Sequence, residues 1–183
     1  MADDAAFTGG SGRATLRPTA PAPALTVRLL GGGIWTLAEQ RPERFTMIVF
    51  YRGFHCPVCR AYLRDLDRRL EDFASRGVDV LAISGDDEAR ARATREDWGL
   101  ERLRIGYGQS VASMRAWGLF VSRGIKDGEP PRFGEPGLFL VRPDATLFYI
   151  ALNSMPFGRP SLADMLGAID FVAETNYPAR GEL

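Results

Sequence analysis

The chain of 183 residues has two cysteines, and both lie in one short motif, Cys56-Pro57-Val58-Cys59. Residues three apart on a helix share a face with their Cβ atoms about 5 to 6 Å apart, and a disulfide needs about 3.8 Å. A small adjustment brings the sulfurs together, so the spacing predicts a reversible dithiol–disulfide pair. A zinc site is disfavoured, because zinc takes about four ligands and the neighbouring His55 is the chain's one histidine. A purely structural disulfide and two inert buried cysteines stay open as alternatives.

The two cysteines are expected to have different roles because they occupy different places on a helix. Pro57 suits a first helical turn, which puts Cys56 at the N-cap. The free N–H groups and the macrodipole there stabilise an anion and lower the thiol pKa from its free value of about 8.5. We expect Cys56 to be reachable from water and to attack as a thiolate, and Cys59, one turn further in, to resolve the mixed disulfide. A cationic His55 would favour the thiolate, and an exposed ring without a role is the alternative.

The motif lies between a predicted strand and a predicted helix. Residues 45–51 (FTMIVFY) form a nearly continuous apolar run, which predicts a strand buried on both faces. Apolar residues at spacings of three and four predict a helix that begins at Pro57 and ends at Gly77. A C-x-x-C motif at such a junction favours redox chemistry over an inert pair.

The remaining elements predict an α/β fold with a mixed central sheet. Strands joined by helices imply parallel pairing, two hairpins add antiparallel strands, and helices cover both faces. Residues 122–135 are expected to be a Gly/Pro-rich connection. The expected strands are residues 25–29, 34–37, 78–84, 103–107, 138–141 and 146–152, and the expected helices run from an Asp86 cap to Trp98, over 110–117, and onward from a Ser161 cap.

Composition excludes several classes of protein. The 23 basic and 23 acidic residues cancel, so no nucleic-acid partner is expected, and no apolar run reaches the length of about 18 that a membrane span needs. Two cysteines cannot form a disulfide-dense secreted scaffold. Residues 1–24 predict an N-terminal arm or flexible tail before a domain over 25–183. Asp3 and Asp4 lie where a secretory signal carries positive charge, so we expect a cytoplasmic protein.

The segment FYRGFHCPVCRAYLRDL resembles the active-site segment of the peroxiredoxin-like (alkyl hydroperoxide reductase/thiol-specific antioxidant) family of the thioredoxin superfamily. The sequences AWGL at 116–119, GLFLV at 137–141 and NSMPFGR at 153–159 resemble further family segments. The resemblance covers residues 25–175 and implies a thioredoxin-like fold. It also implies a thioredoxin- or glutathione-type thiol donor and a disulfide or peroxide substrate, without metal or organic cofactor. A homodimer is compatible with it.

Two positions depart from the family pattern. The family has a hydroxyl residue three positions before its reactive cysteine and an arginine directly before G-L-F, where this chain has Gly53 and Pro136. Arg159 matches the family's second active-site arginine, and Arg52 is a candidate substitute for the missing one. These departures weaken the resemblance to a peroxidase.

The segment Gly134-Glu135-Pro136-Gly137 resembles the thioredoxin segment that holds a cis-proline facing the dithiol. We therefore predict a cis Glu135–Pro136 bond, with Pro136 shaping a ledge for the substrate.

The resulting hypothesis is a thiol–disulfide oxidoreductase that contributes to cell redox homeostasis. Cys56 attacks, Cys59 resolves, and Arg159 or His55 tunes the local charge. A thiol-dependent peroxidase that reduces hydrogen or alkyl peroxides is the second hypothesis. A redox-sensing interaction module without turnover is the third and belongs to another class.

Overall fold

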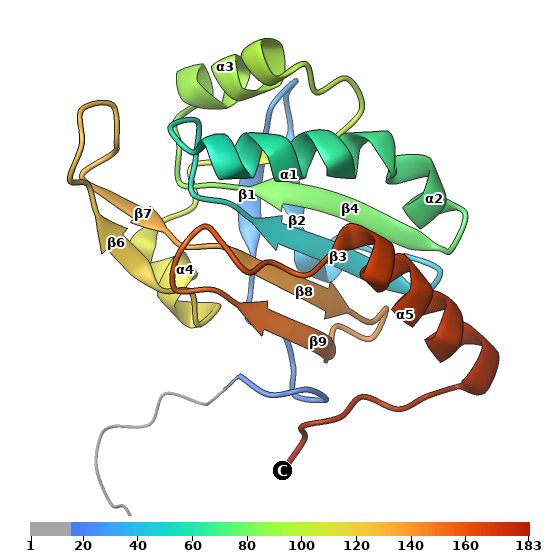
Figure 1. Cartoon of the computed structure of the whole chain (residues 1–183). Coiled ribbons are helices and arrows are strands. Elements are labelled where there is room, and N and C mark those ends of the chain that lie inside the picture. The colour runs from blue at the N-terminus through green and yellow to red at the C-terminus, as the bar shows by residue number, and fades with distance from the viewer. Residues whose placement is uncertain (1–15) are drawn as a thin grey trace, which may run out of the picture.

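In the computed structural model, which describes residues 16–183, seven strands form one mixed sheet in the order β2-β1-β5-β4-β3-β8-β9 (Figure 1). The pairs β3–β4 and β4–β5 are parallel, and the pairs β1–β2, β1–β5, β3–β8 and β8–β9 are antiparallel. The predicted mixed α/β sheet is confirmed. The strands are β1 (Thr26–Leu29), β2 (Ile34–Thr36), β3 (Phe45–Phe50), β4 (Val78–Ile83), β5 (Ile105–Tyr107), β8 (Gly137–Val141) and β9 (Leu147–Leu152).

Helices cover both faces of this sheet, as the sequence predicts. One face packs against α1, α2, α3 and α5, and the other packs against α4 and the 3-10 helix η1. Because α1 and α3 connect parallel neighbours in the order β3-β4-β5, they lie on the same face (Figure 1). The helices are α1 (Pro57–Arg68), α2 (Leu70–Ala74), α3 (Glu88–Trp98), α4 (Val111–Ala116), α5 (Leu162–Thr175) and η1 (Leu37–Glu39).

Strand β3 is the centre of the core and leads directly to the cysteine motif. All six of its residues are buried, which confirms the strand predicted from the apolar run. Met47 and Val49 pack into the cluster beneath α1, and Ile48 and Phe50 pack into the cluster on the opposite face. The cysteines therefore follow one of the best-anchored segments of the chain.

The helix predicted from Pro57 to Gly77 is two helices. Arg69 leaves the helical conformation with φ −96° and ψ 4°, and α2 continues in a new direction. The buried carboxylate of Asp67 accepts the N–H groups of Arg102 and Leu103 at 3.0 and 2.7 Å, which ties the end of α1 to the loop before β5. Phe73 of α2 is fully buried after the break. Long-range contacts, which local periodicity does not report, therefore end α1 early.

The connection expected over residues 122–135 contains a small antiparallel hairpin. Its strands are β6 (Val121–Arg123) and β7 (Arg132–Gly134), and Phe133 is 1% exposed. Most of the glycines and prolines occupy the loop between the strands, so composition alone did not predict the strands. Figure 1 shows this hairpin extending from the sheet beside the β3–α1 junction.

Residues 16–24 of the predicted arm lie along the outer edge of the sheet. Thr19 N–H donates to the Leu147 carbonyl at 2.7 Å, and Leu147 N–H donates to the Ala20 carbonyl at 2.9 Å. These bonds occupy part of the edge of β9, which would otherwise be unpaired. Residues 1–15 of that arm lie outside the described residues. Within the described range, no helix has both the length and the apolar character to cross a membrane.

Candidate redox site

The two cysteines lie at the first turn of α1, as predicted. Cys56 is the N-cap residue, Pro57 begins the helix, and the sulfur of Cys56 accepts the N–H of Cys59 at 3.1 Å. The two side chains form a disulfide, and their Cα atoms are 5.2 Å apart. The same N–H group would stabilise a Cys56 thiolate in the reduced protein.

Both sulfur-bearing residues are buried in this disulfide state. Cys56 is 1% exposed and Cys59 is 0% exposed. The expectation that Cys56 is reachable from water is therefore wrong for this state. The reason is tertiary, because the N-cap belongs to the core cluster beneath α1 rather than to an open helix end. A reaction partner can reach Cys56 only after the residues that bury it move.

The loop between β3 and α1 is held by Asp86, which the sequence predicted as the cap of α3. Asp87 is the cap instead, and its carboxylate accepts the N–H of Arg90 at 2.9 Å. Asp86 is 2% exposed, and its carboxylate accepts the Phe54 N–H at 2.7 Å and the Arg90 Nε–H at 2.9 Å. Asp86 therefore supports the segment that leads to Cys56. Two acidic residues after a buried strand were the available signal, but they did not show which one turns inward.

Gly53 is required by this local arrangement. Its φ is +129°, in the region that favours glycine, and a Cβ built there would lie 2.7 Å from both carboxylate oxygens of Asp86. Gly53, which stands where the family has a hydroxyl residue, is thus needed for the conformation of the loop and for its close approach to Asp86.

His55 does not have either of its predicted environments. Both ring nitrogens are buried without a hydrogen-bond partner among the described residues, and the ring packs on Phe133 with centroids 4.6 Å apart. Burial lowers the pKa of His55, and the nearby Arg52 lowers it further. In the disulfide state these two effects both favour the neutral ring over the cationic one.

Arg52, the candidate substitute for a family arginine, is engaged elsewhere. Its Nε lies 3.3 Å from Oε2 of Glu135, and its guanidinium lies over the Phe133 ring at 4.6 Å. Glu135 is 3% exposed and accepts a hydrogen bond from the Ser122 hydroxyl at 2.5 Å. Arg52 thus connects the β3–α1 loop to the β6–β7 hairpin.

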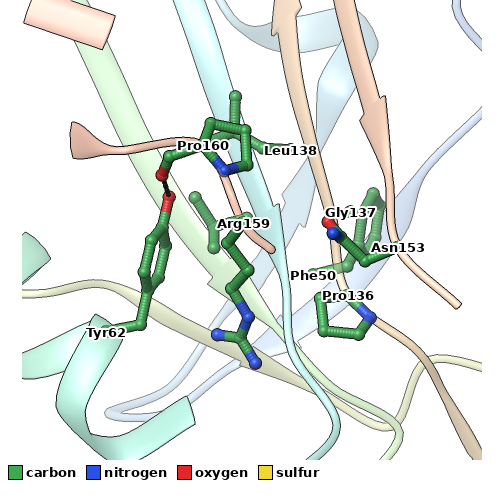
Figure 2. A pocket seen from close by; sticks show the side chains of 9 residues that line it. Phe50, Tyr62, Pro136, Gly137, Leu138, Asn153, Arg159 and Pro160 are labelled. Atoms are coloured by element: carbon green, nitrogen blue, oxygen red, sulfur yellow. Dashed lines mark hydrogen bonds between the residues drawn. The ribbon is translucent and has the colours of Figure 1, made fainter. Parts of the chain in front are cut away.

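The predicted cis bond before Pro136 is wrong, because the described residues contain no cis peptide bond. Glu135 N–H donates to the Phe120 carbonyl at 2.7 Å, and Asn153 N–H donates to the Pro136 carbonyl at 3.0 Å. These bonds hold the segment extended as it enters β8, which is the conformation that a residue before a trans proline prefers. Pro136 still lines a water-sized cavity of about 10 Å³ together with Tyr62 and Arg159 (Figure 2).

Arg159 contacts the inner cysteine. Its Nη2 lies 2.7 Å from the sulfur of Cys59, its Nε donates to the Pro156 carbonyl at 3.1 Å, and its guanidinium lies 5.1 Å from the centroid of the Tyr62 ring. Burial lowers the pKa of Arg159 to about 10, so the side chain is still cationic at neutral pH. Figure 2 shows the guanidinium between Tyr62 and Pro136.

The structure therefore brings Cys56, Cys59, Arg159 and Pro136 to one site and turns Arg52 toward the hairpin. The sequence did not indicate that Tyr62 and Asp86 belong to the site. Tyr62 lies three residues after Cys59, so helical spacing was a usable signal for it. Within residues 16–183, no group of three or more His, Cys, Asp or Glu side chains could hold a metal ion.

A disulfide at the first helical turn after a central strand, on a mixed sheet covered by helices, is an arrangement typical of the thioredoxin superfamily. A model of the AhpC/TSA family matches residues 18–150. The chain belongs to this family, as its active-site segment predicts. No curated protein sequence matches the chain.

Solved structures with the same fold are peroxiredoxins. The reduced 2-Cys peroxiredoxin of Plasmodium vivax superposes with a TM-score of 0.72 at 16% identity, over 87% of this chain and 98% of that one. Peroxiredoxin 6 of Arenicola marina, as a cysteine-to-serine mutant, gives 0.73 at 17% identity, over 91% and 80%. The peroxidoxin BcpB of Mycobacterium tuberculosis gives 0.69 at 14% identity, over 86% and 98%. At these identities the likeness shows the shared thioredoxin-like fold.

Proposed function

We propose that this protein is a thiol–disulfide oxidoreductase in which Cys56 and Cys59 exchange electrons with a disulfide substrate. The observation that carries the proposal is the disulfide between an N-cap cysteine and a cysteine one turn later. The helix end stabilises one thiolate, and the spacing keeps the second sulfur within bonding distance.

The reaction runs in two exchanges. The Cys56 thiolate attacks a sulfur of the substrate disulfide, which forms a mixed disulfide and releases one substrate thiolate. Cys59, as a thiolate, then attacks the sulfur of Cys56, which releases the second substrate thiolate and leaves the Cys56–Cys59 disulfide. A thioredoxin- or glutathione-type thiol donor returns the pair to the dithiol, so turnover needs no metal or organic cofactor. The setting that suits this cycle is the reducing cytoplasm, where it would contribute to cell redox homeostasis.

Access to Cys56 requires a movement near the β6–β7 hairpin. Cys56 is 1% exposed, and the adjacent His55 ring packs on Phe133 of β7. The Arg52–Glu135 ion pair joins the same loop to the residue after β7. Separation of these contacts would free the chain around Cys56 without breaking a strand of the central sheet.

Peroxide reduction is the second candidate, and membership in the AhpC/TSA family favours it. Three features make it the weaker one. Gly53 offers no hydroxyl, Pro136 replaces an arginine, and the remaining Arg159 contacts Cys59 rather than Cys56.

One parallel assay tests the proposal. Reduced protein is mixed with hydrogen peroxide and, separately, with a model protein disulfide, and the two rates of dithiol oxidation are compared. We expect the protein disulfide to react faster, and Cys56→Ser to abolish the reaction. Disulfide reduction that survives Cys56→Ser would overturn the proposal.

The same assay separates the alternatives. Peroxide oxidation much faster than that of free cysteine would favour the peroxidase. Redox-dependent partner binding or oligomerisation without turnover would favour the redox-sensing module.

A further inference from the structure

We propose that Arg159 is a catalytic residue that receives Cys59 as the leaving thiolate when a donor thiol reduces the Cys56–Cys59 disulfide. This inference rests on the proposed oxidoreductase function and adds the step that regenerates the dithiol. It pairs the Arg159 cation with the sulfur of Cys59, whereas the helix N-terminus stabilises the sulfur of Cys56.

The guanidinium is held in place before any reaction. Its Nε donates to the Pro156 carbonyl at 3.1 Å and its face lies against the Tyr62 ring, whose hydroxyl donates to the Pro160 carbonyl at 2.9 Å. Nη2 lies 2.7 Å from the sulfur of Cys59. A donor group that is already oriented loses little further freedom when charge develops on that sulfur.

Arg159 forms no direct ion pair with a described residue in the disulfide state, although the charge of the buried Glu135 acts on it from beyond ion-pair distance. Among the described residues no carboxylate forms an ion pair with it, and burial raises the pKa of Tyr62, so this phenol is neutral. Its Nη1 is also buried without a hydrogen-bond partner. A buried cation of this kind is costly, and a thiolate formed beside it compensates the charge. The geometry therefore favours bond cleavage that puts the negative charge on Cys59.

The step balances as an exchange at sulfur. A donor thiolate attacks the sulfur of Cys56, a new bond joins the donor sulfur to Cys56, and the Cys56–Cys59 bond breaks. The electron pair of the broken bond goes to Cys59, which leaves as a thiolate against Nη2 of Arg159. A leaving thiol of lower pKa leaves faster, so the guanidinium accelerates this step. A second donor thiolate then releases Cys56 and forms the oxidised donor.

The first measurement isolates Cys59. In a Cys56→Ser variant, the ultraviolet absorbance of the thiolate gives the pKa of Cys59 directly. We expect a value well below the free thiol value of about 8.5. A second change, Arg159→Gln, should raise it, and Arg159→Lys should restore part of the depression because it keeps the charge. A Cys59 pKa at or above the free value in Cys56→Ser overturns the inference.

The second measurement follows the reduction itself. The rate of disulfide reduction by a small thiol, measured against pH, should fall about tenfold in Arg159→Gln, because the leaving thiol has become more basic. Arg142→Gln is the matched control, since Arg142 also lies over an aromatic ring, that of Phe148 at 4.7 Å, away from the cysteines. Circular dichroism reports whether each variant folds. If Arg159→Gln does not fold, Arg159→Lys decides instead: a Cys59 pKa raised relative to Cys56→Ser alone supports the inference, and an unchanged pKa overturns it.

The two proposals fail in different ways. An unchanged reduction rate in folded Arg159→Gln, with activity still lost in Cys56→Ser, overturns the role of Arg159 and leaves the oxidoreductase function standing. Activity that survives Cys56→Ser overturns the oxidoreductase function, whatever the pKa of Cys59.

Discussion

The residues on the two flanks of the Cys56–Cys59 disulfide differ in their charge and in their contacts. One flank, the arginine flank, consists of Tyr62, Pro136 and Arg159, and its guanidinium contacts the sulfur of Cys59. The other, the hairpin flank, consists of Arg52, His55, Phe133 and Glu135. There burial favours the neutral form of the histidine, and the arginine is paired with a buried carboxylate. The arginine flank thus places a cation against a sulfur, whereas the charged groups of the hairpin flank contact one another.

This contrast shows that residue type does not decide a role near a reactive sulfur. Arg52 lies four residues before Cys56, and Arg159 lies 100 residues after Cys59, yet the distant arginine is the one that reaches a sulfur. The buried Glu135 accounts for the difference, because it engages Arg52. Substitutions on one flank at a time test this difference.

The largest expected effect comes from Gly53, which lies between Arg52 and His55 of the hairpin flank. Gly53→Thr would restore the family's hydroxyl, but the backbone conformation alone should cost about 1–3 kcal/mol of unfolding free energy. A further loss is expected because the added Cβ would lie 2.7 Å from the oxygens of Asp86. Urea unfolding measures the change. The matched control is Gly32→Thr, where φ is +107° and a Cβ meets nothing within 4 Å. Equal losses in the two variants would show that Asp86 does not restrict Gly53.

A somewhat smaller effect is expected from Asp86. Asp86→Ala removes the acceptor of the Phe54 N–H and should cost about 1–3 kcal/mol of unfolding free energy. It should also speed alkylation of reduced Cys56, because the loop before it loosens. Asp87→Ala removes only the helix cap and should cost about 1 kcal/mol with no change in alkylation. The same alkylation rate in both variants would contradict the role of Asp86 in holding the β3–α1 loop.

Access of a thiol to the disulfide should increase after a mild change in Phe133. Phe133→Leu keeps an apolar side chain, should cost less than about 1.5 kcal/mol, and removes the aromatic contacts with His55 and Arg52. We expect a several-fold faster reduction of the disulfide by a bulky thiol. Phe148→Leu, at a ring that Arg142 covers, is the control without contact to this flank. A rate equal to the control would place the cover of Cys56 elsewhere.

The smallest expected effect is a pH dependence of stability from His55. Burial lowers its pKa below the unfolded value of about 6.5, so the unfolded state binds more protons between the two values. Unfolding free energy should therefore rise with pH through this window and level off above about 6.5. Because His55 is the chain's one histidine, His55→Asn should remove the slope. A slope that persists in His55→Asn would assign it to other groups.

Much of the site was predictable because it depends on residues close in the chain. The apolar run predicted β3, Pro57 and the cysteine spacing predicted an N-cap cysteine with a disulfide partner, and the active-site segment indicated the family. Strand alternation, helix spacing and capping are local rules, so the order of residues was enough.

Only the tertiary structure decided which residues contact the cysteines and the loops beside them. Asp86 rather than Asp87 turned inward because Phe54 and Arg90 offered donors there, and Glu135–Pro136 was trans although its sequence resembles a cis-proline segment. The burial of Cys56 and the pairing of Arg159 with Cys59 depend on segments far apart in the chain. Which side chain meets which sulfur depends on how the loop after β9 packs against α1, and no local rule encodes that packing.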